Sequence, residues 1–286
     1  MDDGKLRALL TAVDCGSFSK AAAQLGYTQS AMTHLVNKLE AEIGCTLLER
    51  DSQGIRLTDA GRQLLPYIQN VVCACDTLLQ EAAEQSDPRK RTLRIGCFAS
   101  IARARLPELL RVFRAEHPEI QLDVLVRSEE LTTALASGRI QLALVDEARA
   151  KGFDFQPLAD APLVAVVPPD FPWEEDTIPL ERLLREPFLS SPDQYIEPFL
   201  PADAPRVEVS ASDDGAILSM VAAGLGVAVL SSFSLVGYEE RVRVLQLEQP
   251  IALRLGAAVK SINAAGTSAR TFLSFLCAYY GQGERL

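Results

Sequence analysis

The sequence predicts an α/β chain of several domains, because two kinds of periodicity divide it near residue 90. Helical spacing of apolar residues dominates the first 87 residues, whereas strand-like and helix-like stretches alternate from residue 92 onward, which is typical of α/β folds with mainly parallel sheets. A length of 286 residues also exceeds the usual size of one domain. Between the two parts, a charged stretch contains a helix-stopping proline at position 88. We expect four segments: residues 1–58, residues 59–87, a hinge at 88–91, and residues 92–286.

The first segment has the pattern of short helices joined by tight turns. An apolar stripe over residues 5–14 predicts one helix. Ser17 and Gly26 favour the start and the end of a second, short helix, and Thr28 is a suitable N-cap for a longer one that reaches about Ile43. Two helices that meet at a glycine turn form a helix-turn-helix, whose second helix enters the major groove of DNA in many proteins.

The pattern after Gly44 predicts a wing. Strand-like stretches at residues 46–50 and 55–57 flank a turn at residues 51–54, which is the spacing of a two-stranded hairpin. The N-terminal segment is therefore predicted to be a winged helix-turn-helix.

The second helix of this motif has one apolar face and one face rich in hydrogen-bonding side chains. Gln, Ser, Thr, His and Asn form hydrogen bonds with base edges and phosphates, in contrast to the Glu and Lys pairs that usually solubilise a helix. An ordinary solvated helix surface is the alternative interpretation. We expect this face and its N-cap to contact double-stranded DNA: Thr28, Gln29, Ser30, Thr33, His34, Asn37 and Lys38.

The charge of the chain argues against indiscriminate attraction to nucleic acid. The net charge is −10 and the isoelectric point is near 4.9, whereas nonspecific affinity for polyphosphate requires Lys and Arg that neutralise phosphates. Specific binding must then rest on hydrogen bonds, a few well-placed cations and the bivalency of a dimer, and it should depend only weakly on salt. The first 58 residues hold six basic side chains and seven acidic ones: Lys5, Arg7, Lys20, Lys38, Arg50 and Arg56 against Asp2, Asp3, Asp14, Glu40, Glu42, Glu49 and Asp51.

Residues 59–87 are predicted to form one long helix. Apolar residues recur in it with alternating spacings of four and three, the seam of a short coiled coil that is buried against a partner helix. The alternative is a helix packed on its own domain. The seam consists of Leu64, Ile68, Val71, Cys75, Leu78 and Ala82.

Several function classes lack the residues that they need. His34 and His117 offer no catalytic triad, the glycines at 224 and 226 lack the third glycine of a dinucleotide loop, and metal-ligand spacing is absent. We therefore expect no enzyme activity, no cofactor and no metal.

Six scattered cysteines indicate free thiols in a reducing compartment, and without a leader or a membrane helix we expect a soluble, cytoplasmic protein. Two interpretations of Cys97 remain: a thiol that senses redox state, and a buried structural thiol.

The first 61 residues carry a specific set of short motifs. They include Gly16-Ser17-Phe18, Ala21-Ala22, Thr28-Gln29-Ser30-Ala31, Leu47-Leu48-Glu49-Arg50 and Leu57-Thr58-Asp59-Ala60-Gly61. In order and spacing, this set resembles the N-terminal signature of LysR-type transcriptional regulators. The resemblance implies that the polar helix reads DNA, that Arg50 and Arg56 contact DNA from the wing, and that the long helix is an antiparallel dimer linker. Ser30, His34 and Leu48 depart from the residues common in that family, which bears on the DNA sequence preference rather than on the fold.

Elements of both kinds alternate after the hinge. Expected strands are 93–98, 121–126, 142–145, 163–167, 206–209 and 227–230, and expected helices are 101–116, 129–137, 180–185, 215–223 and 268–280. With Leu106-Pro107, His117-Pro118 and the run at 221–226, this order is similar to the family's effector domain, which has two lobes of periplasmic-binding-protein type. The resemblance implies a first lobe of residues 92–161 plus 266–286 and a second lobe of residues 162–265.

Loops at the carboxyl ends of the strands are the expected effector site, because ligands of such folds bind there and helix N-termini favour anions. Ser100, Ser128 and Ser212 are more typical of simple helix N-caps, although a cap that faces a cleft can also bind a ligand, and a surface arginine is the favoured alternative interpretation of Arg127. The identity of the small-molecule effector does not follow from these residues. The candidates are Ala99, Ser100, Arg127, Ser128, Asp146, Ser190 and Ser212.

Two functional hypotheses follow from the sequence. The first is an effector-responsive transcriptional regulator that binds two-fold-related DNA sites as a homodimer or homotetramer. The second, suggested by the acidic charge balance, is a small-molecule sensor or carrier whose DNA-binding domain is weak or vestigial.

Overall fold

The structure is a computed structural model that describes residues 2–51, 54–87, 91–127, 130–190, 206–209 and 214–281. The chain divides into two compact units, Met1–Pro88 with Ala136–Arg139 and Arg89–Leu135 with Ile140–Leu286. The division at residues 88 and 89 falls in the charged segment expected to be a hinge. In the described ranges, no helix has both the length and the apolar character needed to cross a membrane.

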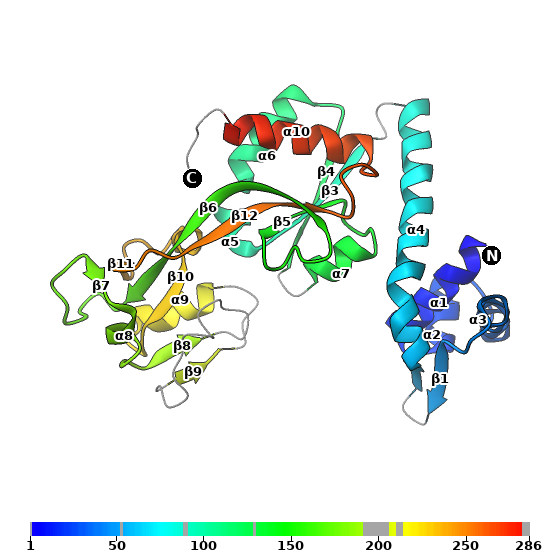
Figure 1. Ribbon diagram of the computed structural model, residues 1–286, viewed down its shortest axis with the longest axis horizontal. Helices are drawn as coiled ribbons and strands as arrows, with labels where there is room; N and C mark the ends of the chain where they lie inside the picture. Colours follow the sequence, from blue (N-terminus) through cyan, green and yellow to red (C-terminus); the bar gives the residue numbers. More distant parts are fainter. Residues whose placement is uncertain are drawn as a thin grey trace. The chain divides into compact units, whose positions relative to one another are not determined.

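The first unit consists of helices and one small hairpin (Figure 1). Its hairpin strands pair in antiparallel register, with Leu48 opposite Leu57. This architecture is the predicted winged helix-turn-helix followed by a long helix. The elements are α1 (Asp3–Cys15), α2 (Phe18–Leu25), α3 (Gln29–Ile43), β1 (Leu48–Asp51), β2 (Gly54–Leu57) and α4 (Asp59–Ser86).

Glycines end the first three helices. Gly16, Gly26 and Gly44 have φ values of 59°, 72° and 87°, a region of backbone conformation that favours glycine. Thr28 caps α3 as predicted, because its Oγ1 accepts a hydrogen bond from the backbone N–H of Ala31. Ser17 stands at the N-cap position of α2, but its side chain makes no capping hydrogen bond. The turns around α2 therefore depend on glycine rather than on the Ser17 hydroxyl.

The amino-terminal half of α4 belongs to the core of the first unit. Ile68 and Val72, four residues apart and hence on one helix face, are buried in the same cluster as the apolar residues of α1 and α3. Val71 and Leu78 are exposed. The predicted coiled-coil seam is therefore wrong at Ile68, where the alternative of packing on its own domain holds.

The second unit is built on an eight-stranded mixed sheet in the order β4-β3-β5-β12-β6-β11-β7, with β10 also paired to β6. A separate two-stranded sheet joins β8 to β9. The strands are β3 (Thr92–Cys97), β4 (Gln121–Val126), β5 (Leu142–Asp146), β6 (Asp154–Val167), β7 (Thr177–Ile178), β8 (Phe188–Ser190), β9 (Arg206–Glu208), β10 (Ala228–Ser231), β11 (Arg243–Leu247) and β12 (Ala252–Val259).

Helices cover both faces of this sheet, as an α/β fold requires. One apolar cluster packs α6 and α10 against β3 and β5, and another packs α7 against the other face (Figure 1). The helices are α5 (Ala99–Ala104), α6 (Leu106–Glu116), α7 (Leu131–Ala136), α8 (Leu180–Leu183), α9 (Gly215–Ala222) and α10 (Thr267–Gly281), with a 3-10 turn η3 (Ser232–Leu235).

The sheet is mixed rather than mainly parallel, which corrects the prediction. β3 is parallel to β4 and β5, but β12 is antiparallel to both β5 and β6. The expected strand at 163–167 is only the end of β6, and β7, β8, β11 and β12 were not predicted. Because β12 pairs with β5 and places Ala257 and Val259 in the core beside α10, the chain returns to the first lobe before residue 266.

The helix predicted over residues 101–116 is broken at Arg105. This residue has φ −130° and ψ −40°, and it separates α5 from α6. Pro107 lies in the first turn of α6 and lacks the backbone N–H that would continue α5.

Candidate functional site

One face of α3 gathers the residues predicted to read DNA. Met32, Val36 and Leu39 on the opposite face are buried in the core of the first unit. Thr33 is half-buried at the edge of the polar face, whereas Lys38 is exposed. A shallow, solvent-open depression on this face is lined by Gln29, Ser30, Thr33, His34 and Asn37.

The amino end of α3 is organised by its own side chains. Thr28 Oγ1 accepts from the backbone N–H of Ala31 at 3.2 Å and lies 3.0 Å from Ser30 Oγ. Thr28 thus holds Ser30 in the first turn while it caps the helix. The first turn of a helix carries a partial positive charge that favours phosphate oxygens, so this end of α3 suits a polyanion without adding a cation.

The wing offers one described cation. Arg56 is exposed on β2 and stands opposite Glu49 of β1 in the hairpin register. Opposite charges across a hairpin attract, so Glu49 offsets part of the positive charge that Arg56 presents. The side chain of Arg50, the other predicted wing contact, lies outside the described residues.

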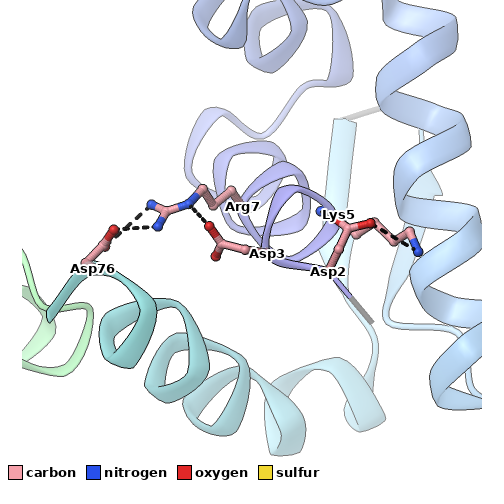
Figure 2. A network of polar contacts seen from close by, with 5 residues as sticks. All are labelled: Asp2, Asp3, Lys5, Arg7 and Asp76. Carbon is pink, nitrogen blue, oxygen red and sulfur yellow. Dashed lines mark hydrogen bonds and ion pairs between the residues drawn. The ribbon is translucent and has the colours of Figure 1, made fainter. Parts of the chain in front are cut away.

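Two of the basic side chains in this region hold helices together, and Figure 2 shows one of them, Arg7, between α1 and α4. Lys5 pairs with Glu42 at 2.5 Å, and Arg7 pairs with Asp76 of α4 and with Asp3. These carboxylates raise the pKa of both cations, chiefly Glu42 for Lys5 and Asp76 for Arg7. Cations committed to protein carboxylates contribute little to phosphate binding. The exposed basic side chains of the helix-turn-helix include Lys20 and Lys38.

Comparisons with known protein families agree with this arrangement. The model described as "LysR substrate binding domain" matches residues 86–280, and the model described as "Bacterial regulatory helix-turn-helix protein, lysR family" matches residues 4–62. The chain belongs to the LysR family. This LysR-family protein is an effector-responsive transcriptional regulator with a helix-turn-helix DNA-binding domain and an effector-binding domain.

The LysR-family regulator has relatives described in the same terms. A Bacillus subtilis protein, described as the uncharacterized HTH-type transcriptional regulator YvbU, is 27% identical over 97% of this chain and 98% of its own. A Mycobacterium leprae protein, described as a probable hydrogen peroxide-inducible genes activator, is 32% identical over 64% of this chain and 60% of its own. Full-length LysG from Corynebacterium glutamicum with bound effector Arg shares the fold, with a TM-score of 0.67, 19% identity and 100% coverage of both chains. These relatives lend no support to the hypothesis of a carrier with a vestigial DNA-binding domain.

In the effector domain of this regulator, the carboxylate of Asp146 is buried and engaged. Its Oδ2 accepts a hydrogen bond from Arg149 Nη1, and its Oδ1 accepts one from the backbone N–H of Arg149, both at 3.0 Å. The Arg149 guanidinium lies 5.0 Å from the centroid of the Phe98 ring. Phe98 directly precedes Ala99 and Ser100, so Arg149 contacts one predicted effector residue, Asp146, and the residue next to two others. Sequence analysis missed Arg149, although its spacing of three from an acidic residue at a strand end was a usable signal.

No described contact joins the remaining effector candidates to Asp146, Arg149 or Phe98. Arg127 is exposed and pairs with Glu130 at 3.0 Å, which matches the alternative interpretation of a surface arginine. Ser190 ends β8, but its side chain lies outside the described residues. Ser128 and Ser212 lie wholly outside them.

Metal binding and thiol reactivity depend on the histidine, cysteine and acidic side chains of the described residues. Within the described ranges, no group of three His, Cys, Asp or Glu side chains is placed to hold a metal ion. All six cysteines are free thiols, and burial raises the pKa of Cys97 to about 12. A thiol that stays protonated at neutral pH is a poor nucleophile, so Cys97 has the properties of a buried structural thiol.

The Gly224-Leu225-Gly226 run forms the predicted tight turn. Gly224 follows α9 with φ 77°, and a Cβ at Gly226 would lie 2.2 Å from the carbonyl oxygen of Pro187. Gly224 thus serves the turn between α9 and β10, and Gly226 allows the backbone to lie close to Pro187, which precedes β8.

Proposed function

We propose that this regulator binds two-fold-related DNA sites as a homodimer or homotetramer. In this proposal residues 1–58 bind DNA, residues 59–87 dimerise, residues 88–91 are the hinge and residues 92–286 bind the effector. The observation that supports the first role is an exposed hydrogen-bonding face on α3 whose opposite face is core. Amide, hydroxyl and imidazole groups match the donors and acceptors of base edges in the major groove. The proposed DNA contacts are Thr28, Gln29, Ser30, Thr33, His34, Asn37, Lys38, Arg50 and Arg56.

A footprint on DNA upstream of the regulator's own gene tests this role. Gln29→Ala removes an amide suited to a bidentate contact with a base, and it should weaken specific binding by about 1–3 kcal/mol while leaving the fold unchanged. Gln249→Ala, an exposed glutamine in the second unit, is the matched control and should bind as the parent protein does. Equal protection by Gln29→Ala and the parent would contradict the proposal.

The exposed apolar side chains of α4 support the dimer. Tyr67, Val71, Leu78 and Leu79 are 68%, 41%, 69% and 65% exposed, which is unusual for four large apolar residues on one helix. A second copy of the helix would cover them by coiled-coil packing. In sedimentation, Leu78→Asp should shift the protein toward monomer, whereas the control Leu225→Asp, at a 57% exposed leucine of the second unit, should not. Identical sedimentation of both variants would exclude this interface.

The effector site is proposed around Arg149, which contacts Asp146 at the end of β5 and Phe98 at the start of α5. Ala99, Ser100, Arg127, Ser128, Ser190 and Ser212 are the further candidates, and Asp146 acts by positioning Arg149. The effector domains of the oligomer associate in two arrangements, and the ligand binds one of them more tightly. This difference in affinity shifts the equilibrium between the two arrangements by about 1–3 kcal/mol.

A footprint with and without the small-molecule fraction of a cell extract tests this site. The parent footprint should change on addition, whereas that of Arg149→Gln should not, with DNA affinity in the absence of extract unchanged. Arg111→Gln, at an exposed arginine on α6, is the control. A parent footprint insensitive to the extract would contradict effector gating, and an Arg149→Gln footprint that still responds would remove Arg149 from the site.

A further inference from the structure

Glu40, in the last turns of α3, makes two hydrogen bonds outside the proposed DNA contacts. Its Oε1 atom accepts from the backbone N–H of Leu47 at 2.7 Å and from that of Leu48 at 3.0 Å. Leu48 is the first residue of β1, so both donors lie at the base of the wing. Leu47 is fully buried, so its N–H cannot turn to water if the carboxylate is removed. Glu40 therefore joins α3 directly to the wing.

The start of α4 holds the same stretch of chain. The backbone N–H of Thr58 donates to the carbonyl oxygen of Leu47 at 2.9 Å, and its Oγ1 donates to that of Thr46 at 2.8 Å. Gly61 lies so close that a Cβ there would be 2.2 Å from the Leu47 oxygen. The base of the wing is thus held by two helices, by α4 at its carbonyl groups and by Glu40 of α3 at its N–H groups.

The base of the wing determines where Arg56, the proposed wing contact, is presented. Leu48, whose N–H binds Glu40, pairs with Leu57 in the hairpin register, and Arg56 is the next residue along β2. A short distance therefore separates the point that Glu40 holds from the cation proposed to contact DNA.

We propose that Glu40 is a positioning residue for DNA binding, which fixes the wing relative to α3 so that Arg56 and the polar face of α3 contact one DNA site together. The inference rests on the proposed DNA contacts. Binding groups are most effective on elements that are already rigid, because ordering a mobile segment on binding costs free energy. A wing released from α3 would be ordered only on binding, and the contribution of Arg56 to affinity would fall.

The wing keeps other attachments when Glu40 is replaced. The backbone N–H of Ile55 donates to the carbonyl oxygen of Gly16 at 3.1 Å, and Leu47 and Leu48 are buried in the apolar core of the first unit. We therefore expect Glu40 variants to fold, with a wing whose orientation relative to α3 is less well defined.

Footprint titrations of the full chain on the DNA upstream of its own gene test the proposal. Arg56→Gln should weaken specific binding of the parent by about tenfold. In a Glu40→Ala background the same change should weaken binding less than about twofold, because two groups that act together are not additive. Glu42→Ala removes an equal charge from α3 but a contact with Lys5 rather than with the wing, so the full effect of Arg56→Gln should persist there.

Two further variants separate the hydrogen bonds of Glu40 from its charge. Glu40→Gln keeps an acceptor oxygen at the same distance along the side chain, so the full effect of Arg56→Gln should return. Glu40→Asp keeps the charge but is one methylene shorter, so it should behave as Glu40→Ala does, and it serves if Glu40→Ala folds poorly. A full effect of Arg56→Gln in the alanine and aspartate backgrounds would overturn the inference, as would a return of the effect with aspartate and not with glutamine.

The contribution of Gln29 distinguishes a loosened wing from a damaged fold. Gln29→Ala should weaken binding as much in the Glu40→Asp background as in the parent, because the first turn of α3 has its own cap. Loss of the Gln29 effect as well would assign Glu40 to the fold of the whole unit and overturn its positioning role. If Arg56→Gln leaves the parent's affinity unchanged, the wing contact in the proposed function fails, and this inference fails with it. An Arg56 effect that is equal in all backgrounds overturns this inference alone.

Discussion

Arg7 of α1 donates hydrogen bonds to both carboxylate oxygens of Asp76 in α4, and its Nε donates to Asp3 at 2.7 Å (Figure 2). Residues 7 and 76 are 69 positions apart in the sequence. The bidentate contact fixes the rotation of α4 about its axis relative to α1, in addition to the apolar core between them.

A double-mutant cycle on Arg7→Met and Asp76→Asn measures this contact. Because the two side chains are 35% and 39% exposed, solvent screens their attraction, and we expect a coupling free energy of about 0.5–1 kcal/mol at low salt. The coupling should shrink as salt rises. Denaturant unfolding provides the measurement, and the exposed pair Arg111 and Glu108 provides the control. A coupling indistinguishable from that control would show that Arg7 and Asp76 add nothing beyond a surface ion pair.

Truncation of Ile68 and truncation of Leu78 in α4 should lower the stability of the protein with different dependences on protein concentration. Ile68 is 6% exposed in the core of the first unit, so Ile68→Ala should lower its stability by about 2–5 kcal/mol at any concentration. Leu78 is 69% exposed, so Leu78→Ala should lower the unfolding temperature only at protein concentrations at which a second copy of α4 covers this side chain. Thermal unfolding over a hundredfold range of concentration separates the two. A concentration-independent loss in Leu78→Ala would argue against the proposed dimer helix.

Cys97 should make the second unit sensitive to alkali. Burial raises the pKa of its thiol from 9.0 to about 12, so the unfolded chain loses this proton first as pH rises. The stabilising contribution of the neutral thiol is present below pH 9 and is lost between pH 9 and 12, at about 1.4 kcal/mol per pH unit. The stability difference between the parent and Cys97→Ala should therefore shrink over that interval, whereas Cys277→Ala, which keeps Cys97, should still lose stability over it.

The same burial should protect Cys97 from thiol reagents. In the native protein at pH 8, the exposed Cys277 should react with a maleimide before Cys97, which should become reactive only on unfolding. Mass spectrometry of tryptic peptides gives the order. Modification of Cys97 in the native protein at a rate matching Cys277 would reopen a redox role for this residue.

Local patterns predicted the helix-turn-helix, because amphipathic spacing and glycine turns act within a few residues. Met32 and Val36 are buried and Gln29 is exposed, as the helical period required. Long-range choices were not predictable in this way. Whether Ile68 faces its own domain or a partner depends on packing against α1, and the pairing of Arg7 with Asp76 joins distant residues that carry no mutual signal.

β12 and the first half of β6 were missed because a simple period of two does not describe them. Burial alternates over the first four residues of β12 and is continuous over the last four, and β6 shows no regular alternation before Ala161. Arg105 was placed in a continuous helix because Pro107 was read as part of it. The proposed effector site depends on Arg149, whose contact with Phe98 joins residues 51 positions apart and carries no signal in the local sequence.

The salt dependence of specific DNA binding should report which lysines contact phosphate. Each cation that neutralises a phosphate of duplex DNA contributes about 0.9 to the slope of log K against log salt. Lys38 is exposed on α3, so Lys38→Met should flatten the slope by about 0.9 for each copy of the regulator bound. Lys5 is committed to Glu42, and the double variant Lys5→Met with Glu42→Gln removes that pair without changing the net charge. Its slope should equal that of the parent, since Lys5 neutralises a carboxylate rather than a phosphate; a slope flattened as in Lys38→Met would place Lys5 at the DNA instead.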